Sequence, residues 1–253
     1  MLEGSTIRRP VVISANNPAS SRCDDCGARH IGMCDALSDE DLGALSRAAQ
    51  HLTIAPGKVF IEEGDPATYF YNVTSGMVRV FKALPDGRRH ITGFMSTGQF
   101  LGLAVSGQCA FSAEAMDEVK LCRFNRTALN QVFADFPALE RRLLNIAAHE
   151  LTIAHEQMLL LARKNAVERV ASYLLNLTFK LESCPGGKLP ATAVTLKLPI
   201  SRADLADYLG LTIETVSRSF AQLKRNGLIE FSNAHAVTLL NPQKLEVVAN
   251  AKG

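Results

Sequence analysis

The sequence predicts an α+β chain: an N-terminal β-roll of the jelly-roll kind, one long helix, and a C-terminal winged helix-turn-helix. Three observations support this fold class. Short apolar runs between glycines fill residues 55–125, a glycine-free amphipathic stretch begins at 126, and residues 193–241 combine a helix-turn-helix pattern with two strand-like runs. With 253 residues and 47% apolar content, the chain can bury a core without disulfides.

The β-roll is predicted from the regular alternation of strand-like runs with glycines. The apolar runs cover 59–61, 69–73, 77–81 and 90–94. The dipeptide Asp86-Gly87 stands between two of these runs and is a strong signal for a hairpin turn. Several short strands at such a spacing are typical of a barrel or a jelly roll.

A long helix is predicted from the apolar spacing that follows the roll, because apolar residues recur at alternating steps of three and four. This stripe consists of Leu144, Ala147, Leu151, Ala154, Met158 and Leu161. The spacing is that of an a/d seam between two helices, although a helix packed on its own domain is the alternative. A second apolar edge at Leu143, Ile146 and Ile153 favours a helix that contacts both the roll and a partner helix. We therefore predict a homodimer.

The segment 201–218 carries the strongest local signal in the chain. Ser201 followed by Asp204 resembles a capping box, and Gly210 allows a tight turn after the first helix. Thr212 can cap the second helix. The buried face of that second helix is predicted to consist of Val216, Phe220 and Leu223. These features predict two helices joined by a tight turn.

This helix pair is the arrangement that places its second helix in the major groove of DNA. The helix-turn-helix residues expected at the DNA are Ser201, Arg202, Thr212, Thr215 and Arg225, while Glu214, Ser217 and Arg218 also face away from the buried side. Arginine can fork to guanine and glutamate can accept from cytosine, so these residue types suit base reading. Strand-like runs at 228–231 and 236–239 predict a wing. A helical hairpin for protein contact is the alternative.

Composition narrows the functional class. The net charge is +2, but residues 165–253 hold 10 Lys/Arg and 7 Asp/Glu, a net charge of +3 that is compatible with DNA contact. No apolar run is long enough for a membrane span, and residues 1–21 lack the apolar core of a signal peptide, so we expect a cytoplasmic protein. No phosphate loop or hydrolase motif occurs, which predicts no catalytic residues and no enzyme.

Six cysteines occur, and three of them cluster as Cys23-x2-Cys26-x7-Cys34. In a reducing compartment such clustering favours a metal site over disulfides. A [4Fe–4S] cluster needs four thiolates, so the fourth would come from elsewhere in the chain. Zinc bound by the cysteine trio and His30 is an alternative, and so are free thiols without a metal.

The roll, the long helix and the winged helix-turn-helix together resemble the CRP/FNR family of bacterial transcription regulators over nearly the whole chain. The run Leu-Thr-Ile-Glu-Thr-Val-Ser-Arg at 211–218 is similar to the recognition helix of the FNR branch, and the run at 159–165 also resembles that branch. The resemblance implies that Glu214, Ser217 and Arg218 contact the bases of a TTGAT half-site. The expected operator is a TTGAT-N4-ATCAA palindrome in double-stranded DNA.

The resemblance also implies oxygen or redox sensing through a [4Fe–4S] cluster. FNR-like sensors hold their cluster with an N-terminal cysteine trio and one cysteine of the roll, and Cys122 stands at the matching position. Cys109 is the competing fourth ligand, and Cys184 is interpreted as a bystander. Loss of the cluster would release the N-terminal segment and unsettle the dimer helix. A regulator of the same fold without a cluster, structured by zinc or switched by thiols, is the alternative.

The chain departs from the family pattern in two places. Nucleotide-binding members have a glutamate after the glycine of the phosphate turn and an arginine beside its Ser or Thr. Here Leu103 follows Gly102 and no arginine stands near Ser112, so no cyclic nucleotide is expected. FNR-like sensors commonly carry an acidic residue in the helix seam, where this chain has Ala154. An entirely apolar seam predicts a dimer that persists when the cluster is lost.

RNA polymerase is a further partner that the resemblance implies, with the loops at 85–89 and 182–192 as candidate contacts. The expected divisions of the chain are a flexible tail over 1–22, a cysteine-bearing segment with the sensor roll over 23–135, a dimerisation helix over 136–164 and a DNA-binding domain over 165–253.

Overall fold

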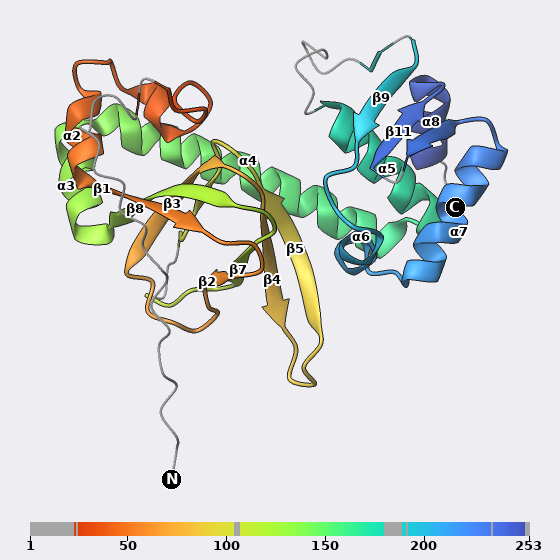
Figure 1. The fold of residues 1–253 in the computed structure, drawn as a ribbon, viewed down its shortest axis with the longest axis horizontal. Coiled ribbons are helices and arrows are strands. Elements are labelled where there is room, and N and C mark those ends of the chain that lie inside the picture. The colour runs from red at the N-terminus through yellow and green to blue at the C-terminus, as the bar shows by residue number, and fades with distance from the viewer. Residues whose placement is uncertain are drawn as a thin grey trace. The chain divides into compact units, whose positions relative to one another are not determined.

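The computed structural model describes residue 23 and residues 25–103, 107–179, 189–190, 192–233 and 235–250. The tail predicted over 1–22 lies outside the described residues. The chain forms two compact units, and the boundary between them follows Glu150, inside a long helix (Figure 1). The N-terminal unit contains the β-roll, and the C-terminal unit contains the winged helix-turn-helix.

The N-terminal unit is a roll of two four-stranded antiparallel sheets, which confirms the predicted fold class. One sheet has the strand order β1-β8-β3-β6 and the other has the order β2-β7-β4-β5. The strands are β1 (Ala49–Ile54), β2 (Val59–Ile61), β3 (Tyr69–Ser75), β4 (Val78–Ala83), β5 (Arg89–Met95), β6 (Phe100–Leu101), β7 (Ser112–Ala115) and β8 (Val119–Asn125). The four apolar runs of the sequence therefore fall on β2, β3, β4 and β5.

The space between the two sheets is the main core of the roll. Tyr71 and Val73 of β3 point into it, opposite Val78 and Val80 of β4, and all four are buried. The β4–β5 hairpin closes with Gly87 at φ +84°, a backbone conformation that glycine adopts without strain. The hairpin signal in the sequence is thus confirmed.

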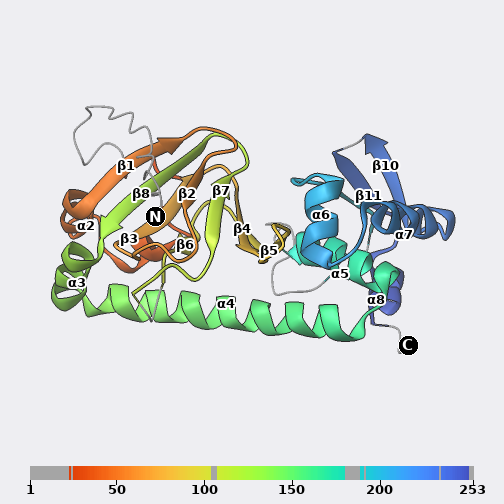
Figure 2. The same ribbon diagram turned by 90° about the horizontal axis from the view of Figure 1, so that it is seen from below.

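A second core lies on the opposite face of the β1-β8-β3-β6 sheet. Among the described residues, the helical elements at this face are η1 (Met33–Ala36), α2 (Leu42–Ala48), α3 (Arg126–Asp135) and the first half of α4 (Pro137–Arg163). Their side chains cover Phe70, Phe100 and Phe124 of the sheet. Helices α2 and α3 lie together at the end of the roll where α4 begins (Figure 2). The sequence did not predict η1 or α2, because both are too short to show a helical period.

Helix α4 corresponds to the predicted long helix, and its two apolar edges have different surroundings. Leu143 is buried and Ile146 is half-buried in the second core. The predicted seam is open to solvent: Leu144 is 68% exposed, Leu151 57% and Met158 58%. Ala154 is also exposed, whereas Ala147 and Leu161 are half-buried. An exposed apolar stripe of this kind indicates a contact surface.

In its described residues, the C-terminal unit combines the second half of α4 and four further helices with a three-stranded antiparallel sheet of the order β10-β11-β9. The helices are α5 (Ala166–Phe179), α6 (Arg202–Leu209), α7 (Ile213–Arg225) and α8 (Pro242–Ala249), and the strands are β9 (Val194–Lys197), β10 (Ile229–Asn233) and β11 (Ala236–Leu239). Strands β10 and β11 are the predicted wing. The sequence did not predict β9, whose pairing partner lies more than thirty residues further along the chain.

Candidate cysteine centre and nucleic-acid interface

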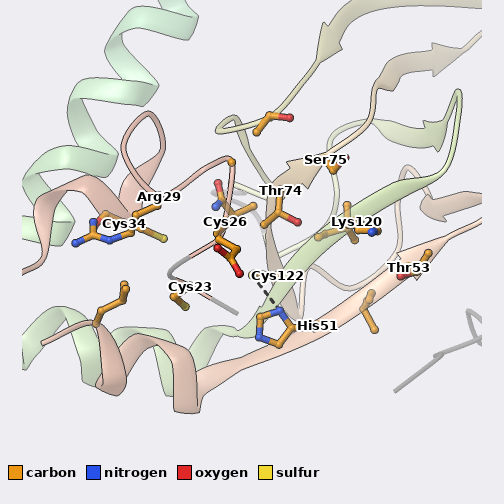
Figure 3. A pocket seen from close by; sticks show the side chains of 17 residues that line it. Cys23, Cys26, Arg29, Cys34, His51, Thr53, Thr74, Ser75, Lys120 and Cys122 are labelled. Atoms are coloured by element: carbon orange, nitrogen blue, oxygen red, sulfur yellow. Dashed lines mark hydrogen bonds between the residues drawn. The ribbon is translucent and has the colours of Figure 1, made fainter. Parts of the chain in front are cut away.

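A cavity of about 650 Å³ in the N-terminal unit brings together cysteines from distant parts of the chain. Cys23, Cys26 and Cys34 line it from the N-terminal segment, and Cys122 lines it from β8 (Figure 3). These are the four cysteines that the sequence proposes as cluster ligands. Side chains separated by almost ninety residues of sequence therefore face one shared space.

Strand pairing explains why Cys122 faces this cavity. In the sheet register, Cys122 of β8 lies opposite His51 of β1 and opposite Asn72 of β3. Residues opposite one another on neighbouring strands share a face of the sheet, and this row lies on the face away from the roll interior. The Nδ1 atom of His51 lies 3.6 Å from Cys122 Sγ.

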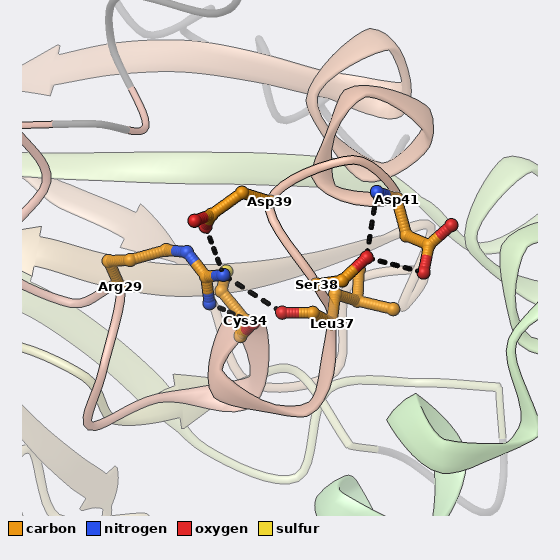
Figure 4. A network of polar contacts seen from close by, with 6 residues as sticks. All are labelled: Arg29, Cys34, Leu37, Ser38, Asp39 and Asp41. Carbon is orange, nitrogen blue, oxygen red and sulfur yellow. Dashed lines mark hydrogen bonds and ion pairs between the residues drawn. The ribbon is translucent and has the colours of Figure 1, made fainter.

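The guanidinium of Arg29 holds the cysteine segment in its turn (Figure 4). Its Nη1 donates to the carbonyl oxygen of Cys34 over 2.6 Å, and its Nη2 donates to the carbonyl oxygen of Leu37 over 2.8 Å. The same Nη2 lies 2.7 Å from Oδ1 of Asp39. Arg29 is only 7% exposed, so its planar set of donors fixes the path of the backbone around Cys34 from within the segment.

The electrostatics of the cavity bear on what it can bind. The pKa of the Cys34 thiol is raised to about 12, chiefly by burial and then by the nearby Cys26 and Cys23, while the charge of Arg29 lowers it. Deprotonation of several thiols in this cavity is therefore unfavourable unless additional positive charge stabilises the thiolates. A bound metal supplies that charge and deprotonates its thiol ligands. The donor set of four cysteines thus fits a thiolate-bound metal centre.

The other candidate ligands lie elsewhere. His30 is exposed and does not line the cavity, whereas His51 does. Cys109 packs against the roll interior instead, and burial and the charge of Asp65 raise its pKa. Cys184 lies outside the described residues. Within the described part of the chain, no three His, Cys, Asp or Glu side chains are close enough, as they stand, to hold a metal ion.

The cysteine segment also contacts the first half of α4. Met33 and Leu37 share the second core with Leu139 and Leu143 of that helix. Arg142 of α4 donates from Nη2 to the carbonyl oxygen of Ile31 over 3.3 Å and from Nε to that of Gly32 over 3.4 Å. A displacement of the segment therefore changes contacts of the helix that carries the exposed seam.

The helix-turn-helix of the C-terminal unit has the predicted caps. Ser201 Oγ accepts from the backbone N–H of Asp204 over 3.0 Å and donates to the Asp204 carboxylate over 2.7 Å. Gly210 ends α6 with φ +62°, and Thr212 Oγ1 accepts from the backbone N–H of Thr215 at the start of α7. All three local signals of the sequence are present in the structure.

Helix α7 separates a buried face from an exposed polar face. Val216, Phe220 and Leu223 are buried as predicted. Glu214, Ser217 and Arg218 are exposed side chains, and so is Arg225 in the last turn. The Ser217 hydroxyl donates to the carbonyl oxygen of Ile213 over 2.9 Å, so its lone pairs point outward as acceptors.

The charge state of Glu214 suits base recognition. Its pKa is lowered by its own backbone N–H, by a hydrogen bond from Thr212 and by the charge of Arg218. Glu214 is therefore ionised at neutral pH, with its oxygens available to accept from a base edge. A carboxylate with a lowered pKa keeps that role until the pH falls well into the acid range.

Arg202 has a different setting from the other predicted contact residues. Its guanidinium carbon lies 3.7 Å from the ring centroid of Phe220 and 5.0 Å from that of Phe231. Arg202 thus stacks on α7 and on the wing strand β10 by cation–π contact. Thr215 is half-buried and paired with Thr212 through their hydroxyls at 3.0 Å. Both residues shape the helix-turn-helix internally.

Arg169 of α5 is a structural residue that the sequence did not identify. Its Nη1 donates to the carbonyl oxygen of Leu209 over 2.8 Å, where α6 ends, and its Nη2 donates to that of Leu161 over 2.8 Å, near the end of α4. Its Nε donates to the carbonyl oxygen of Lys164 over 2.9 Å. One cation therefore satisfies carbonyls at two helix C-termini, where positive charge is favoured.

We expect Arg169→Met to destabilise the C-terminal unit by about 2–4 kcal/mol, because charge-assisted hydrogen bonds are lost while the aliphatic stem is kept. Urea unfolding measures this change. Arg163→Met is the matched control, because Arg163 is an exposed arginine at the end of α4. We expect the control to change the stability by no more than about 0.5 kcal/mol. Equal effects of the two substitutions would contradict the role of Arg169.

The fold and these surfaces define a class of protein: a regulator in which a sensor β-roll is joined to a winged helix-turn-helix. Comparison with known families agrees with this class. Residues 51–136 match the cyclic nucleotide-binding domain, and residues 168–248 match the Crp-like helix-turn-helix domain. None of the described helices combines the length and the apolar content needed to cross a bilayer.

The chain belongs to the Crp/FNR family of transcription regulators, which bind DNA as dimers and are not enzymes. It is 39% identical to the nitrogen fixation regulation protein FixK of Bradyrhizobium diazoefficiens over 92% of this chain and 96% of that protein. It is 32% identical to the transcriptional activator protein FnrL of Cereibacter sphaeroides over 88% and 90%, respectively. The solved structure of FixK2 from Bradyrhizobium japonicum has a TM-score of 0.71 at 36% identity and covers 81% of this chain and 99% of that one.

Sequence reasoning missed several residues around the cavity. His51 and Asn72 come beside Cys122 only through strand register, and Arg142 reaches the cysteine segment from more than a hundred residues away. Arg29 carried a local signal, because it lies between Cys26 and Cys34 in the sequence. A cation within a cysteine cluster indicates a residue that organises the segment or compensates thiolate charge.

Proposed function

We propose that this protein is a homodimeric transcription regulator of the cytoplasm that senses oxygen or redox state through a [4Fe–4S] cluster. Cys23, Cys26, Cys34 and Cys122 are the ligands in this proposal, and the operator is a TTGAT-N4-ATCAA palindrome. The observation that carries it is the single cavity lined by all four cysteines. The similarity to a protein named transcriptional activator FnrL supports an activating role, with RNA polymerase as a partner.

The cavity is lined by as many cysteine thiols as such a cluster requires. Each iron takes one thiolate, so four cysteines complete the set without a further ligand. When bound, the cluster would supply an oxygen-sensitive centre whose loss frees the three N-terminal cysteines. The hydrogen bond from Arg29 to the Cys34 carbonyl oxygen holds the turn around Cys34. Cys122 lies on the sheet side of the cavity, where the pairing of β8 with β3 holds its backbone.

The contacts of α4 provide a route from the cavity to the dimer interface. Arg142 links the helix to the carbonyl oxygens of Ile31 and Gly32, and Leu139 and Leu143 pack beneath the same segment. When the segment is held on the sheet, these contacts support the helix in one position. When the cysteines are released, the helix loses part of its packing.

Zinc or thiol chemistry is the second candidate, and one observation favours it. His51 lies 3.6 Å from Cys122 and lines the same cavity, so cysteines and a histidine are available together. Such a mixed set suits zinc. In that case His51 takes the place that His30 holds in the interpretation from sequence alone.

The deciding experiment is a visible absorption spectrum of protein purified without air, with assays for iron, sulfide and zinc. We expect a brown protein with about four irons and four sulfides per chain that bleaches in air. DNA binding to the palindrome should be tight before exposure to air and weaker after it. A colourless protein with one zinc or no metal would contradict the cluster and would favour the second candidate, zinc or thiol chemistry.

We also propose that the roll takes no cyclic nucleotide, although residues 51–136 match a domain named for that ligand. The phosphate turn has Leu103 after Gly102 and no arginine beside Ser112. Ser112 Oγ instead accepts from the backbone N–H of Glu63 over 3.0 Å. Arg126 donates to the carbonyl oxygen of Gly102 over 2.6 Å, so it serves the backbone of that turn.

The seam of α4 provides a test of dimerisation. Leu151→Glu would place two like charges near the two-fold axis, because Leu151 is 57% exposed on the predicted interface. We expect this variant to sediment as a monomer at micromolar concentration and to bind the palindrome at least about tenfold more weakly. His149→Glu is the control, because His149 is exposed on the opposite side of the helix from the seam.

The same sedimentation measurement addresses the unmodified protein without its cluster. Because the proposed seam holds no charge from Leu144 to Leu161, we expect the apoprotein to remain dimeric at micromolar concentration. A monomeric apoprotein, or a dimeric Leu151→Glu variant, would contradict this account of the interface.

A further inference from the structure

Asn72 is a buried polar residue whose side chain has no partner among the described residues. It is 1% exposed, and neither its Oδ1 nor its Nδ2 makes a hydrogen bond. Burying an amide without a partner is unfavourable, and most buried polar groups in native proteins are satisfied. The other buried polar side chains near it follow this rule, as Arg29 does with its three acceptors. The exception at Asn72 therefore needs an explanation.

The location of Asn72 explains why its buried amide has no partner among the described residues. Asn72 lines the cysteine cavity, and on β3 it lies directly opposite Cys122 of β8. A Cβ atom added to Gly32 would lie 3.3 Å from Asn72 Oδ1, so the glycine lets the cysteine segment approach the amide closely. The amide is thus enclosed between the fourth cysteine and the segment that carries the other three.

We infer that the Asn72 carboxamide donates a hydrogen bond to a sulfur atom of the group held by the four cysteines. This inference rests on the proposed function, and it assigns Asn72 as a positioning residue that tunes the cluster without ligating it. The acceptor is a cysteine thiolate or an inorganic sulfide, both of which carry negative charge. An amide N–H is a donor that suits such an acceptor, and Asn72 is only 1% exposed.

The hydrogen bond has a defined chemical consequence. Donors to the sulfurs of an iron–sulfur centre raise its reduction potential, because they stabilise the more negative state. Removal of the amide therefore makes the cluster easier to oxidise. We expect the cluster of the Asn72→Leu variant to be lost in air about fivefold faster than that of the wild type.

The decisive test compares thermal melting of the apoprotein and of the cluster-loaded protein, both kept without air. Leucine has nearly the same shape as asparagine and carries no polar atoms. In the apoprotein, Asn72→Leu should raise the melting temperature by about 2–6 °C, because an unsatisfied amide is removed. In the loaded protein the gain should vanish or reverse, because the amide has a partner there. Resonance Raman bands of the Fe–S bonds should shift in the loaded variant.

A second variant at Asn72 and a control variant at Thr74 complete this test. Asn72→Ala gives the same comparison if leucine disturbs the sheet, since only the difference between loaded and apo forms is used. Thr74→Val is the matched control, because Thr74 lines the same cavity two residues further along β3 and should leave the Fe–S bands and the oxygen reaction unchanged.

The outcomes separate this inference from the proposed function. If the wild type acquires no iron and sulfide under reconstitution, the proposed function fails and the inference fails with it. If the cluster forms but Asn72→Leu changes the melting temperature equally in both forms, with unaltered Fe–S bands, the cluster proposal stands and the role of Asn72 is overturned. A water molecule as the partner of the amide would give that second result.

Discussion

Cys122→Ser should lower the iron content from about four atoms per chain to near zero, whereas Cys109→Ser should leave it unchanged. The two substitutions are chemically identical and both lie in the roll, which makes them a matched pair. Cys122 lines the cavity with the cysteine trio, while Cys109 packs against the roll interior. Because the two cysteines lie in different places, we expect opposite effects on the iron content from the same substitution.

The effect on DNA binding should follow the iron content. We expect Cys122→Ser to weaken anaerobic binding to the palindrome by about 10- to 100-fold, a size typical of coupling between two sites in one protein. Iron analysis and a fluorescence anisotropy titration without air measure the two quantities. Loss of iron in Cys109→Ser, or full iron content in Cys122→Ser, would contradict the assignment of the fourth ligand.

Arg218→Ala should have the largest effect on operator recognition. Arg218 is exposed on α7 one residue after Ser217, whose hydroxyl also faces outward. A fork from arginine to guanine contributes about 1–3 kcal/mol at each base pair, and a dimer makes the contact twice. The expected loss for the full palindrome is therefore about 2–6 kcal/mol, or roughly 30-fold to more than a thousandfold in affinity.

Arg218→Lys separates base recognition from charge. Lysine keeps the positive charge but cannot form the bidentate fork, so we expect a substantial loss on the palindrome and little change on unrelated DNA. Arg225→Ala should weaken binding to both DNAs by similar, smaller factors, because the last turn of the helix suits phosphate contact. Equal losses for Arg218→Ala on operator and unrelated DNA would show that this residue does not read a base.

The local features of this protein were predictable because their causes are local. Ser201, Gly210 and Thr212 mark the helix-turn-helix through caps and a left-handed turn, each of which depends on a few neighbouring residues. The exposed seam of α4 was predictable for the same reason, since helical spacing alone places Leu144 and Leu151 on one stripe. The cysteine trio was visible as a motif within twelve residues of sequence.

The surroundings of the cysteines could not be predicted in this way, because they depend on residues that are distant in the sequence. The choice between Cys109 and Cys122 came from a family resemblance, and the residues by themselves left it open. In the structure, strand register places Cys122 on the helical face of the sheet beside His51 and Asn72, whereas Cys109 packs against the roll interior. The structure also places His30 on the surface and outside the lining of the cysteine cavity, which its position in the sequence did not show.

The sequence by itself determined the order of the roll, the long helix and the winged helix-turn-helix, together with the buried and exposed faces of α7. These follow from apolar periodicity and from capping, which act over one or two turns of chain. Only the tertiary structure decided what surrounds the cysteines: the Arg29 fork, the unpartnered amide of Asn72 and the contact of Arg142 with the segment. Such contacts depend on which strands pair and in which register, and these pairings join residues that no local pattern connects.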